Sequence, residues 1–292
     1  MFEGFDRRDI ETRETVIHAR IGGSGPPLLL LHGYPQTHVM WHRVAPALAE
    51  RFTVVCADLR GYGDSGKPPT DPEHLTYSKR KSAGDMVDVM SALGFERFLL
   101  AGHDRGGRVA HRLALDHPDR VQKVSFLDIV PTRTLFQATD QAIATGYYHW
   151  FFLIQPNGLP ERLIGGDPAF YLQAKLGHWG KGGVELFAPE ALSEYERCFR
   201  DPDVIHASCE DYRAGASIDL VHDEADLDRK IACPVQALWG FHGMMERHFD
   251  VLACWRERAA GGLEGKALDC GHFLAEEQPE ATVAELMNFF DG

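Results

Sequence analysis

The sequence lacks the cysteine patterns that hold metal ions or disulfide frameworks. Its six cysteines, among 292 residues, form no C-x-x-C pair and no spacing typical of a zinc site. Reduced thiols are the usual state of cysteine in the cytoplasm. We therefore expect a cytoplasmic protein with neither a structural zinc ion nor a disulfide scaffold.

Basic charge and long apolar runs are also scarce. The 30 Lys and Arg residues are outnumbered by 43 Asp and Glu residues, which gives a formal net charge of −13. Nucleic acids and anionic membranes favour clustered basic residues, so we expect neither as a partner. No run approaches the length of a transmembrane helix, and the charged segment MFEGFDRRDIETRE does not resemble a signal peptide. An anionic substrate would need a local cationic pocket.

The segment LLAGHDRGGRVAHR, residues 99–112, predicts a sharp turn between a buried strand and a helix. The pattern G-x-S-x-G places a nucleophilic serine at such a turn in α/β-hydrolases, and Asp104 occupies that position here. A carboxylate is already ionised at pH 7 and needs no base to activate it. It suits displacement at an alkyl carbon, which leaves an ester on the enzyme. The alternative is that Asp104 merely caps the helix.

Apolar runs that alternate with helical patterns predict an α/β fold with a mostly parallel sheet and helices on both faces. The length fits one α/β-hydrolase core, residues 1–130 and 222–292, with an inserted helical cap at 131–221. The expected cap is rich in aromatic residues and lacks strand-like runs. We expect strands within 15–23, 27–31, 51–59, 96–102, 123–130, 233–240 and 265–273, and a C-terminal helix at 279–290.

One glycine-rich motif suggests a dinucleotide site. The segment GYGDSG, residues 61–66, matches G-x-G-x-x-G after an expected strand. Such a site needs a helix directly after the glycines, to bind the pyrophosphate at its N-terminus. Pro68 and Pro69 disfavour that helix, so we expect a turn and no nucleotide.

Cleavage of an enzyme-bound ester requires a base and groups that stabilise an oxyanion. His272, in DCGHFLAEE, follows the last expected strand, where α/β-hydrolases keep their histidine. Asp128, at the end of FLDIVP, is the candidate to orient His272, because FHGMM after the next strand contains no acid. The alternative is that Asp128 only caps a turn. The backbone N–H groups of Tyr34, in HGYP, and Arg105 are the candidate oxyanion donors.

Two arginines follow Asp104. Arg105 and Arg108 are three residues apart and share one face of the expected helix, whereas Arg112 should pair with Asp116. A substrate carboxylate about 4 Å from Asp104 would be repelled by roughly 4 kcal/mol at an effective dielectric near 20. Two guanidinium groups gripping that carboxylate would cancel the repulsion. The alternative is that the arginines only pair with surface acids.

The sequence resembles the fluoroacetate (haloacetate) dehalogenases of the α/β-hydrolase superfamily over nearly its whole length. The matching stretches are LLLLHGYPQTHVMWHRVAP, ADLRGYG, AGHDRGGRVAHRLALDHP, LDIVPT, YYHWFFLIQP, CEDYRAG and GHFLAEE. The arginine after the nucleophilic aspartate is specific, because related haloalkane dehalogenases and epoxide hydrolases typically carry Trp there. The resemblance implies Asp104 as nucleophile, His272 as base with Asp128 as its partner, and Arg105 with Arg108 as the carboxylate clamp.

The resemblance also implies a halide pocket formed by His149, Trp150 and Tyr212, whose side chains all offer hydrogen-bond donors. Trp179 is a further candidate for the lining of that cavity. Without the resemblance, YYHWFF would be interpreted as an aromatic core of the cap. The family often has HGFP in the oxyanion loop, where this sequence has Tyr34. A homodimer is implied as well.

The expected reaction is hydrolytic dehalogenation of a small 2-haloacid such as fluoroacetate, without a metal or organic cofactor. Asp104 displaces the halide, and His272 activates the water that releases a 2-hydroxy acid such as glycolate. One alternative is a dehalogenase limited to chloro- and bromoacids. Another is an epoxide hydrolase, in which Tyr212 and either Tyr147 or Tyr148 donate to the epoxide. A third is a non-enzymatic protein that binds a small acid.

Overall fold

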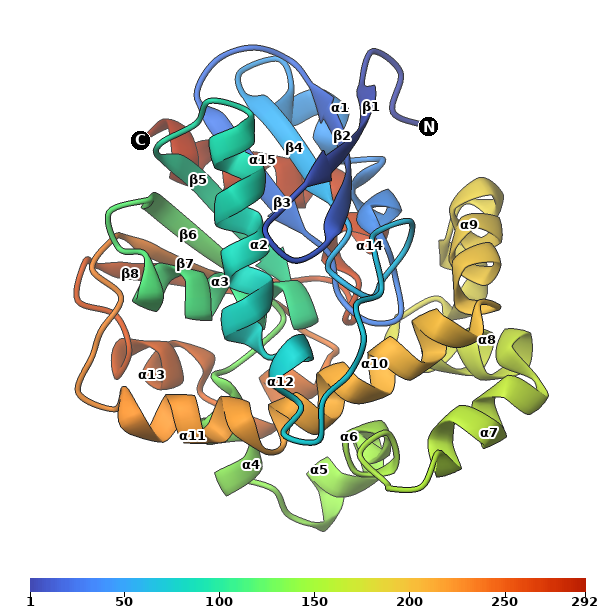
Figure 1. The fold of residues 1–292 in the computed structure, drawn as a ribbon. Coiled ribbons are helices and arrows are strands. Elements are labelled where there is room, and N and C mark those ends of the chain that lie inside the picture. The colour runs from blue at the N-terminus through green and yellow to red at the C-terminus, as the bar shows by residue number, and fades with distance from the viewer.

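The computed structural model describes all 292 residues, and a single eight-stranded sheet lies at its centre (Figure 1). The strand order is β1-β2-β4-β3-β5-β6-β7-β8. β2 pairs antiparallel with β1 and β4, and all other neighbours are parallel. The predicted mostly parallel sheet is therefore confirmed. The strands are β1 (Asp6–Glu11), β2 (Val16–Gly22), β3 (Pro27–Leu31), β4 (Thr53–Ala57), β5 (Phe98–His103), β6 (Val121–Leu127), β7 (Val235–Gly240) and β8 (Leu263–Leu268).

The first strand was not expected from the sequence. β1 is an edge strand with the sequence DRRDIE, and only Ile10 among its six residues is buried. A strand with a single buried side chain has no alternation of apolar and polar residues that would reveal it. Its charged side chains suit an exposed edge, because they discourage pairing with another chain.

Helices cover both faces of the sheet. Figure 1 shows α2 (Lys79–Ala92) and α3 (Arg105–Asp116) in front of the strands and α15 (Pro279–Asp291) behind them. The C-terminal helix expected at 279–290 is therefore confirmed. The remaining helical elements of this part are η1 (His38–Trp41), α1 (Ala45–Leu48), η2 (Leu75–Tyr77), α12 (Met244–His248), α13 (Val251–Arg256) and α14 (Leu274–Glu277).

A block of helices without any strand separates β6 from β7. In Figure 1 these helices, which we call the inserted helices, run below the sheet and to its right. The last of them ends at Ala225, slightly beyond the boundary expected at residue 221. They are α4 (Thr132–Gln137), α5 (Gln141–Gly146), α6 (Tyr148–Phe152), α7 (Leu159–Gly166), α8 (Pro168–Trp179), η3 (Gly183–Leu186), α9 (Pro189–Phe199), α10 (Pro202–Gly215) and α11 (Ile218–Ala225).

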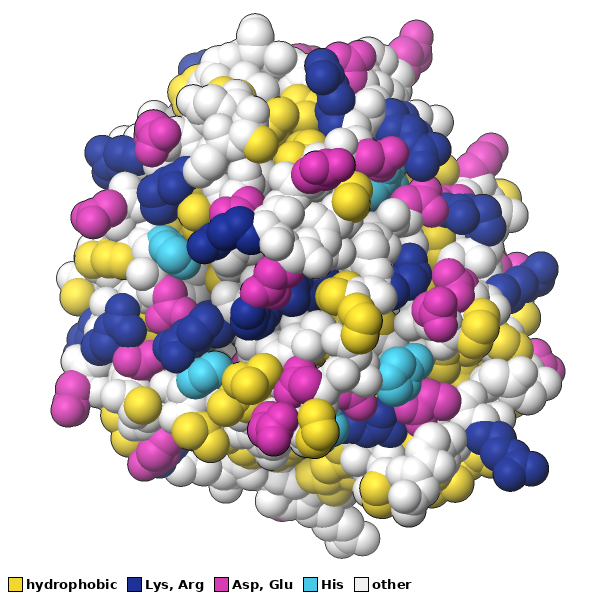
Figure 2. All heavy atoms as spheres, in the orientation of Figure 1, with side chains coloured by type: hydrophobic (Ala, Val, Ile, Leu, Met, Phe, Trp, Pro, Cys, Tyr) yellow, Lys and Arg dark blue, Asp and Glu magenta, His cyan; other side chains and the backbone are white.

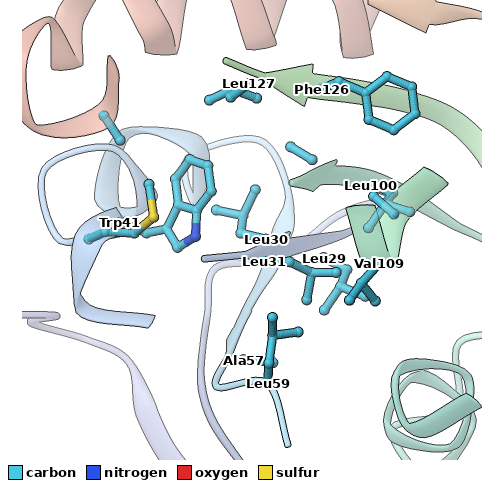
Figure 3. Packing of buried hydrophobic residues seen from close by; sticks show 14 of the residues in the cluster. Leu29, Leu30, Leu31, Trp41, Ala57, Leu59, Leu100, Val109, Phe126 and Leu127 are labelled. Carbon is cyan, nitrogen blue, oxygen red and sulfur yellow. The ribbon is translucent and has the colours of Figure 1, made fainter. Parts of the chain in front are cut away.

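The central strands are apolar along their whole length because helices cover both of their faces. Leu29, Leu30 and Leu31 of β3 and Leu100 of β5 are fully buried. Figure 3 shows them near Val109 of α3, with Phe126 and Leu127 of β6 beside them. This packing fixes the ends of β3, β5 and β6, from which the loops to Tyr34, Asp104 and Asp128 emerge.

The glycine-rich segment 61–66 forms turns, as expected. No helix follows it, and the next helical element is the short η2, which begins at Leu75. Gly63 has φ +53°, and a Cβ atom there would lie 2.1 Å from Asp58 Oδ2. The glycine is thus required by a tight turn around a buried carboxylate. The segment lacks the geometry of a dinucleotide site.

Acidic and basic side chains are interspersed over the face of the protein shown in Figure 2. No helix has the length and hydropathy of a membrane-spanning segment.

Candidate active site

Asp104 lies at the sharp turn between β5 and α3. Its backbone has φ +46° and ψ −113°, a strained conformation for a residue with a side chain. Flanking glycines make the turn sterically possible: a Cβ atom at Gly102 would lie 2.5 Å from Gly106 O, and one at Gly106 would lie 2.4 Å from His32 O. The Asp104 side chain makes no capping hydrogen bond to the helix. The interpretation of Asp104 as a simple helix cap is therefore wrong.

The Asp104 carboxylate points toward the loop that follows β3. The backbone N–H of Tyr34 donates a hydrogen bond to Asp104 Oδ1 at 2.8 Å. Gly33 allows this approach, because a Cβ atom there would lie only 2.5 Å from Asp104 Cβ. One of the two expected oxyanion donors is thus beside the carboxylate. The N–H of Arg105 makes no hydrogen bond to Asp104, so its role stays a prediction.

His272 and Asp128 are in direct contact. His272 Nδ1 lies 2.6 Å from Asp128 Oδ2, and Asp128 Oδ1 accepts a hydrogen bond from Gly240 N at 2.8 Å. Burial lowers the pKa of His272, but the hydrogen bond and charge of Asp128 outweigh it and raise that pKa above 6.5. The Asp128 carboxylate therefore holds the His272 ring with its Nδ1–H pointing at Asp128. Nε2 stays available to accept a proton from water.

A second histidine, which the sequence analysis did not single out, tethers the His272 loop. His103 Nε2 lies 2.8 Å from the backbone oxygen of His272, and the two rings are 4.5 Å apart. Burial, together with the charge of His272, lowers the pKa of His103 to about 3. His103 is therefore a neutral donor that holds the base in place. Its position directly before Asp104 in AGHDRGG was the available signal.

Asp104 is ionised although it is buried. Burial raises the pKa of its carboxyl group, but the neighbouring histidines and arginines outweigh this effect and hold that pKa below 3.8. The side chain is thus a charged carboxylate, 7% exposed, at the end of a buried strand. Such a group can attack an electrophilic carbon without prior loss of a proton.

Arg105 is fully buried and is held by an acid of the inserted helices. Its Nε donates to Asp211 Oδ2 at 2.6 Å, and its Nη2 donates to the backbone oxygen of Asp211 at 2.7 Å. Asp211 also pairs with Lys79 Nζ and accepts a hydrogen bond from Tyr62 OH at 2.9 Å. Arg105 Nη1 has no partner. Asp211 was not predicted as a site residue, although it directly precedes Tyr212 in CEDYRAG.

Arg108 is buried without a carboxylate partner. Its Nη1 donates to Val130 O at 3.1 Å and to Thr132 Oγ1 at 3.0 Å, while its Nε has no partner. Burial and the charge of Arg105 lower the pKa of Arg108 to about 10. Neither arginine pairs with a surface acid, so that alternative is wrong. The predicted pair of Arg112 with Asp116 is present at 3.3 Å.

The aromatic residues expected at the halide site converge around the arginines. Arg105 Cζ lies 4.1 Å from the ring centre of Tyr212, and Arg108 Cζ lies 4.5 Å from that of Trp150. The His149 ring lies 5.5 Å from Tyr212 and 4.5 Å from Trp179. The structure thus brings these residues together in one cluster, which we call the aromatic–arginine cluster.

Several buried polar atoms of the aromatic–arginine cluster have no hydrogen-bond partner, and most of them are donors. A buried donor without an acceptor costs about 1–3 kcal/mol. Buried groups of this kind are complementary to a ligand that brings acceptors and negative charge. The unpartnered atoms are Arg105 Nη1, Arg108 Nε, Trp179 Nε1, Tyr212 OH and His149 Nδ1.

A hollow of about 320 Å³ borders the aromatic–arginine cluster at Trp179 and reaches Asp128 and His272. Its lining includes Trp179 and the basic side chains of His178, Lys181, His242 and Arg247. Lys181 Nζ lies 2.8 Å and His242 Nε2 lies 2.6 Å from Asp269 Oδ1, so both of these groups already have an acid partner. The hollow does not include Asp104, Arg105 or Arg108, which are all at most 7% exposed.

Comparison with known proteins decides the family. A family model of the alpha/beta hydrolase fold matches residues 26–279. The chain belongs to the α/β-hydrolase family. A fluoroacetate dehalogenase from Burkholderia sp is 48% identical over 289 residues, which cover 99% of this chain and 95% of that protein. The resemblance inferred from the sequence is thereby confirmed.

Two further relatives of this hydrolase show how wide the group is. A soluble epoxide hydrolase from Corynebacterium sp. (strain C12) is 36% identical over 282 residues, or 94% of this chain and 93% of that protein. A solved structure from Nostoc sp PCC 7120, assigned provisionally to the α/β hydrolases, has a TM-score of 0.98 and 59% sequence identity. It covers 99% of both chains.

One other cluster in this hydrolase has ligand atoms of the kind that bind metals. Single ligand atoms of His18, His38 and Asp58 lie within 4.8 Å of one another. Asp58 is already engaged, because its Oδ1 accepts from His38 N at 2.7 Å and its Oδ2 accepts from Asp64 N at 3.0 Å. The cluster therefore has a clear structural role in joining two loops.

Proposed function

We propose that this hydrolase removes the halogen from small 2-haloacids, with fluoroacetate among them, through an ester on Asp104. The observation that carries the proposal is the pair of buried arginines beside the Asp104 carboxylate, each with an unpartnered N–H. Two cations at that place suit a substrate that is itself a carboxylate. The 48% identity to a fluoroacetate dehalogenase supports the same substrate class.

Substrate binding would use the N–H groups of the two arginines that have no partner in the protein. Arg105 Nη1 and Arg108 Nε would donate to the substrate carboxylate, while Asp211 holds Nε and Nη2 of Arg105 and Thr132 accepts from Arg108 Nη1. This arrangement offsets the repulsion of roughly 4 kcal/mol between two carboxylates about 4 Å apart. An offset of that size is worth about three powers of ten in rate. It would also direct the α-carbon of the substrate toward Asp104.

The first step would form a carbon–oxygen bond. An Asp104 oxygen attacks the α-carbon, and the carbon–halogen bond breaks with its electron pair leaving on the halide. The donors of His149, Trp150 and Tyr212 would bind that halide where its charge develops. Trp179 Nε1, which is buried and unpartnered, is a further candidate donor. The attack inverts the configuration of a chiral α-carbon.

The second step would hydrolyse the ester. His272 accepts a proton from water, while Asp128 holds the ring and stabilises the resulting positive charge. The hydroxide attacks the Asp104 carboxyl carbon, and the Tyr34 N–H stabilises the oxyanion. The bond between the Asp104 carboxyl carbon and the ester oxygen breaks, and His272 returns its proton to that oxygen. The new carboxyl group loses its proton to solvent, so the products are a 2-hydroxy acid and the free Asp104 carboxylate.

Epoxide hydrolysis is the second candidate, because a soluble epoxide hydrolase is 36% identical and Tyr212 OH is unpartnered. An epoxide carries no carboxylate, so it would leave the buried Arg105 and Arg108 without an anion. We therefore favour the haloacid. A homodimer and a cytoplasmic location stay predictions from the sequence.

Halide release measured with an ion-selective electrode tests the proposal. We expect wild-type enzyme to release fluoride from fluoroacetate and chloride from chloroacetate, and Asp104→Asn to release neither. Release of chloride alone would restrict the function to the easier leaving groups. Turnover of styrene oxide without any halide release would instead establish the epoxide reaction.

A further inference from the structure

Lys175 is a buried cation that the proposed reaction does not use. It lies in α8 of the inserted helices and is 2% exposed. Its ammonium makes no ion pair and no hydrogen bond with the protein. Its contacts are with aromatic rings, at 3.4 Å from the ring centre of Tyr148, 5.4 Å from Trp179 and 5.5 Å from Tyr171. Lysine is almost never fully buried unless it is paired.

The aromatic rings compensate only part of the cost of this burial. Cation–π contacts favour a positive charge, but they do not replace the water that an ammonium loses. Burial lowers the pKa of Lys175 to about 7, which shows how weakly the protein alone supports the charged form. A negative charge arriving nearby would complete the compensation.

Lys175 lies on the Trp179 side of the donors that would receive the halide. It shares Trp179 with His149, whose ring is 4.5 Å from that indole. Burial lowers the pKa of His149 far below 6.5, and the charge of Lys175 is the next largest cause. His149 is therefore neutral, and the positive charges that act on its ring include those of Lys175, Arg105 and Arg108.

We propose that Lys175 is a specificity-determining residue of this site, whose ammonium favours the departure of fluoride over heavier halides. The inference rests on the proposed function, because it concerns the leaving group of that reaction. Fluoride concentrates its charge on a small ion and leaves from a strong bond, so its departure depends most on positive potential. Bromide leaves easily and spreads its charge over a larger ion, so it needs that potential less.

The ratio of fluoride to bromide release in Lys175→Met tests this inference. Methionine keeps the length and the contacts with the aromatic rings but removes the charge. We expect fluoride release to fall roughly 10- to 50-fold and bromide release to change less than about threefold. Lys175→Arg should restore most of the fluoride release. Lys266→Met is the control, because Lys266 lies on the outer strand β8 and pairs with Glu285 of α15.

Thermal unfolding distinguishes this role from a structural one. Removing a buried charge without a partner should leave the melting temperature of Lys175→Met unchanged or higher. A lower melting temperature with an equal loss of both halides would overturn the inference, and so would an unchanged ratio. A wild-type enzyme that releases no halide from any haloacetate would overturn the proposed function and this inference together. An unchanged ratio in an active enzyme would overturn this inference alone.

Discussion

Asp211 of α10 holds the guanidinium of Arg105 of α3, with Arg105 Nε donating to Asp211 Oδ2 at 2.6 Å. The acid belongs to the inserted helices and the arginine follows the candidate nucleophile, so this ion pair joins the two parts of the chain at the site. Burial raises the pKa of Asp211, but Arg105 and Lys79 outweigh it and lower that pKa to about 2. Asp211 engages Nε and Nη2 of Arg105, and Nη1 stays without a partner.

Asp211→Asn should weaken the recognition of an anionic substrate. The amide keeps the shape of the carboxylate but no longer fixes the charged guanidinium. Loss of one partner of a buried charge pair costs about 3–5 kcal/mol, part of which falls on folding. We expect kcat/KM for chloroacetate to fall roughly 10- to 100-fold. The neutral analogue chloroacetamide should change less than about threefold.

Asp219→Asn is the matched control for this prediction. Asp219 accepts a hydrogen bond from the Lys79 backbone N–H at 2.8 Å, but it does not contact Arg105. Its replacement should leave the preference for chloroacetate over chloroacetamide unchanged. An equal loss of activity on both substrates in Asp211→Asn would show that Asp211 supports the fold and does not position Arg105.

Arg108→Met should likewise reduce activity on substrates that carry a negative charge. Arg108 has no carboxylate partner in the protein, so its charge is available to a ligand. We expect kcat/KM for haloacetates to fall by about two to three powers of ten, while the melting temperature changes little. Steady-state kinetics and thermal unfolding measure the two effects.

Arg112→Met serves as the contrast on the same helix. Arg112 pairs with Asp116, Asp223 and Asp226, and its loss leaves the half-buried Asp223 without a cation, while Asp116 and Asp226 keep Arg80 and Arg229. We expect a lower melting temperature and an unchanged ratio of activities on anionic and neutral substrates. A change of that ratio in Arg112→Met alone would contradict the assignment of the clamp to Arg105 and Arg108.

His272→Ala should form the ester and fail to hydrolyse it. The first step uses only the Asp104 carboxylate, whereas the second step needs a base for water. Intact-mass measurement after exposure to chloroacetate should show one carboxymethyl group on the protein. Peptide mapping should place this group on Asp104, and Asp104→Asn should carry none.

A single turnover in heavy-oxygen water checks the same scheme in the wild-type enzyme. The attacking water adds to the Asp104 carboxyl carbon, so the heavy oxygen should enter Asp104 first. The first glycolate released should contain only light oxygen from the enzyme. Heavy oxygen in that first product would show direct attack of water on the substrate and would rule out the ester.

The sequence predicted the parts of this site that have a fixed place along the chain. The turn at Asp104 is marked by its glycines, and His272 and Asp128 each follow an expected strand. Parallel strands bring such positions to the same edge of the sheet, so their approach follows from the fold alone. The contact of 2.6 Å between His272 and Asp128 agrees with that reasoning.

The sequence could not predict contacts that depend on how the inserted helices lie over the sheet. Asp211 and Lys79 are far apart in the chain, and no spacing rule links either of them to Arg105. Lys175 lies in FYLQAKLGHW, where a lysine in an amphipathic helix is typical of a solvated surface. Its burial depends on the packing of α8 against Tyr148, which no local pattern in the sequence indicates. The edge strand β1 was missed for a related reason, because its pairing depends on β2 and not on its own pattern.

The pH dependence of ester hydrolysis should follow the protonation of His272. A protonated ring cannot accept a proton from water, so the rate should be low in acid and rise as the pH passes the pKa of His272. The hydrogen bond and charge of Asp128 raise this pKa above 6.5 despite burial, and the charge of Asp104 adds to the effect. Esterification removes the Asp104 charge, so the midpoint for kcat should lie below that for the free enzyme.

Asp128→Asn separates the effect of Asp128 on the pKa of His272 from the effect of Asp104. Without the Asp128 charge, burial should dominate and move the midpoint of the kcat profile to lower pH. The maximal rate should also fall by about two to four powers of ten, because the imidazolium loses its stabilising partner. The kcat profile reports on ester hydrolysis when this step is the slow one. Accumulation of the ester in rapidly quenched enzyme establishes that it is. A midpoint that moves to higher pH in Asp128→Asn would show that another group is the base.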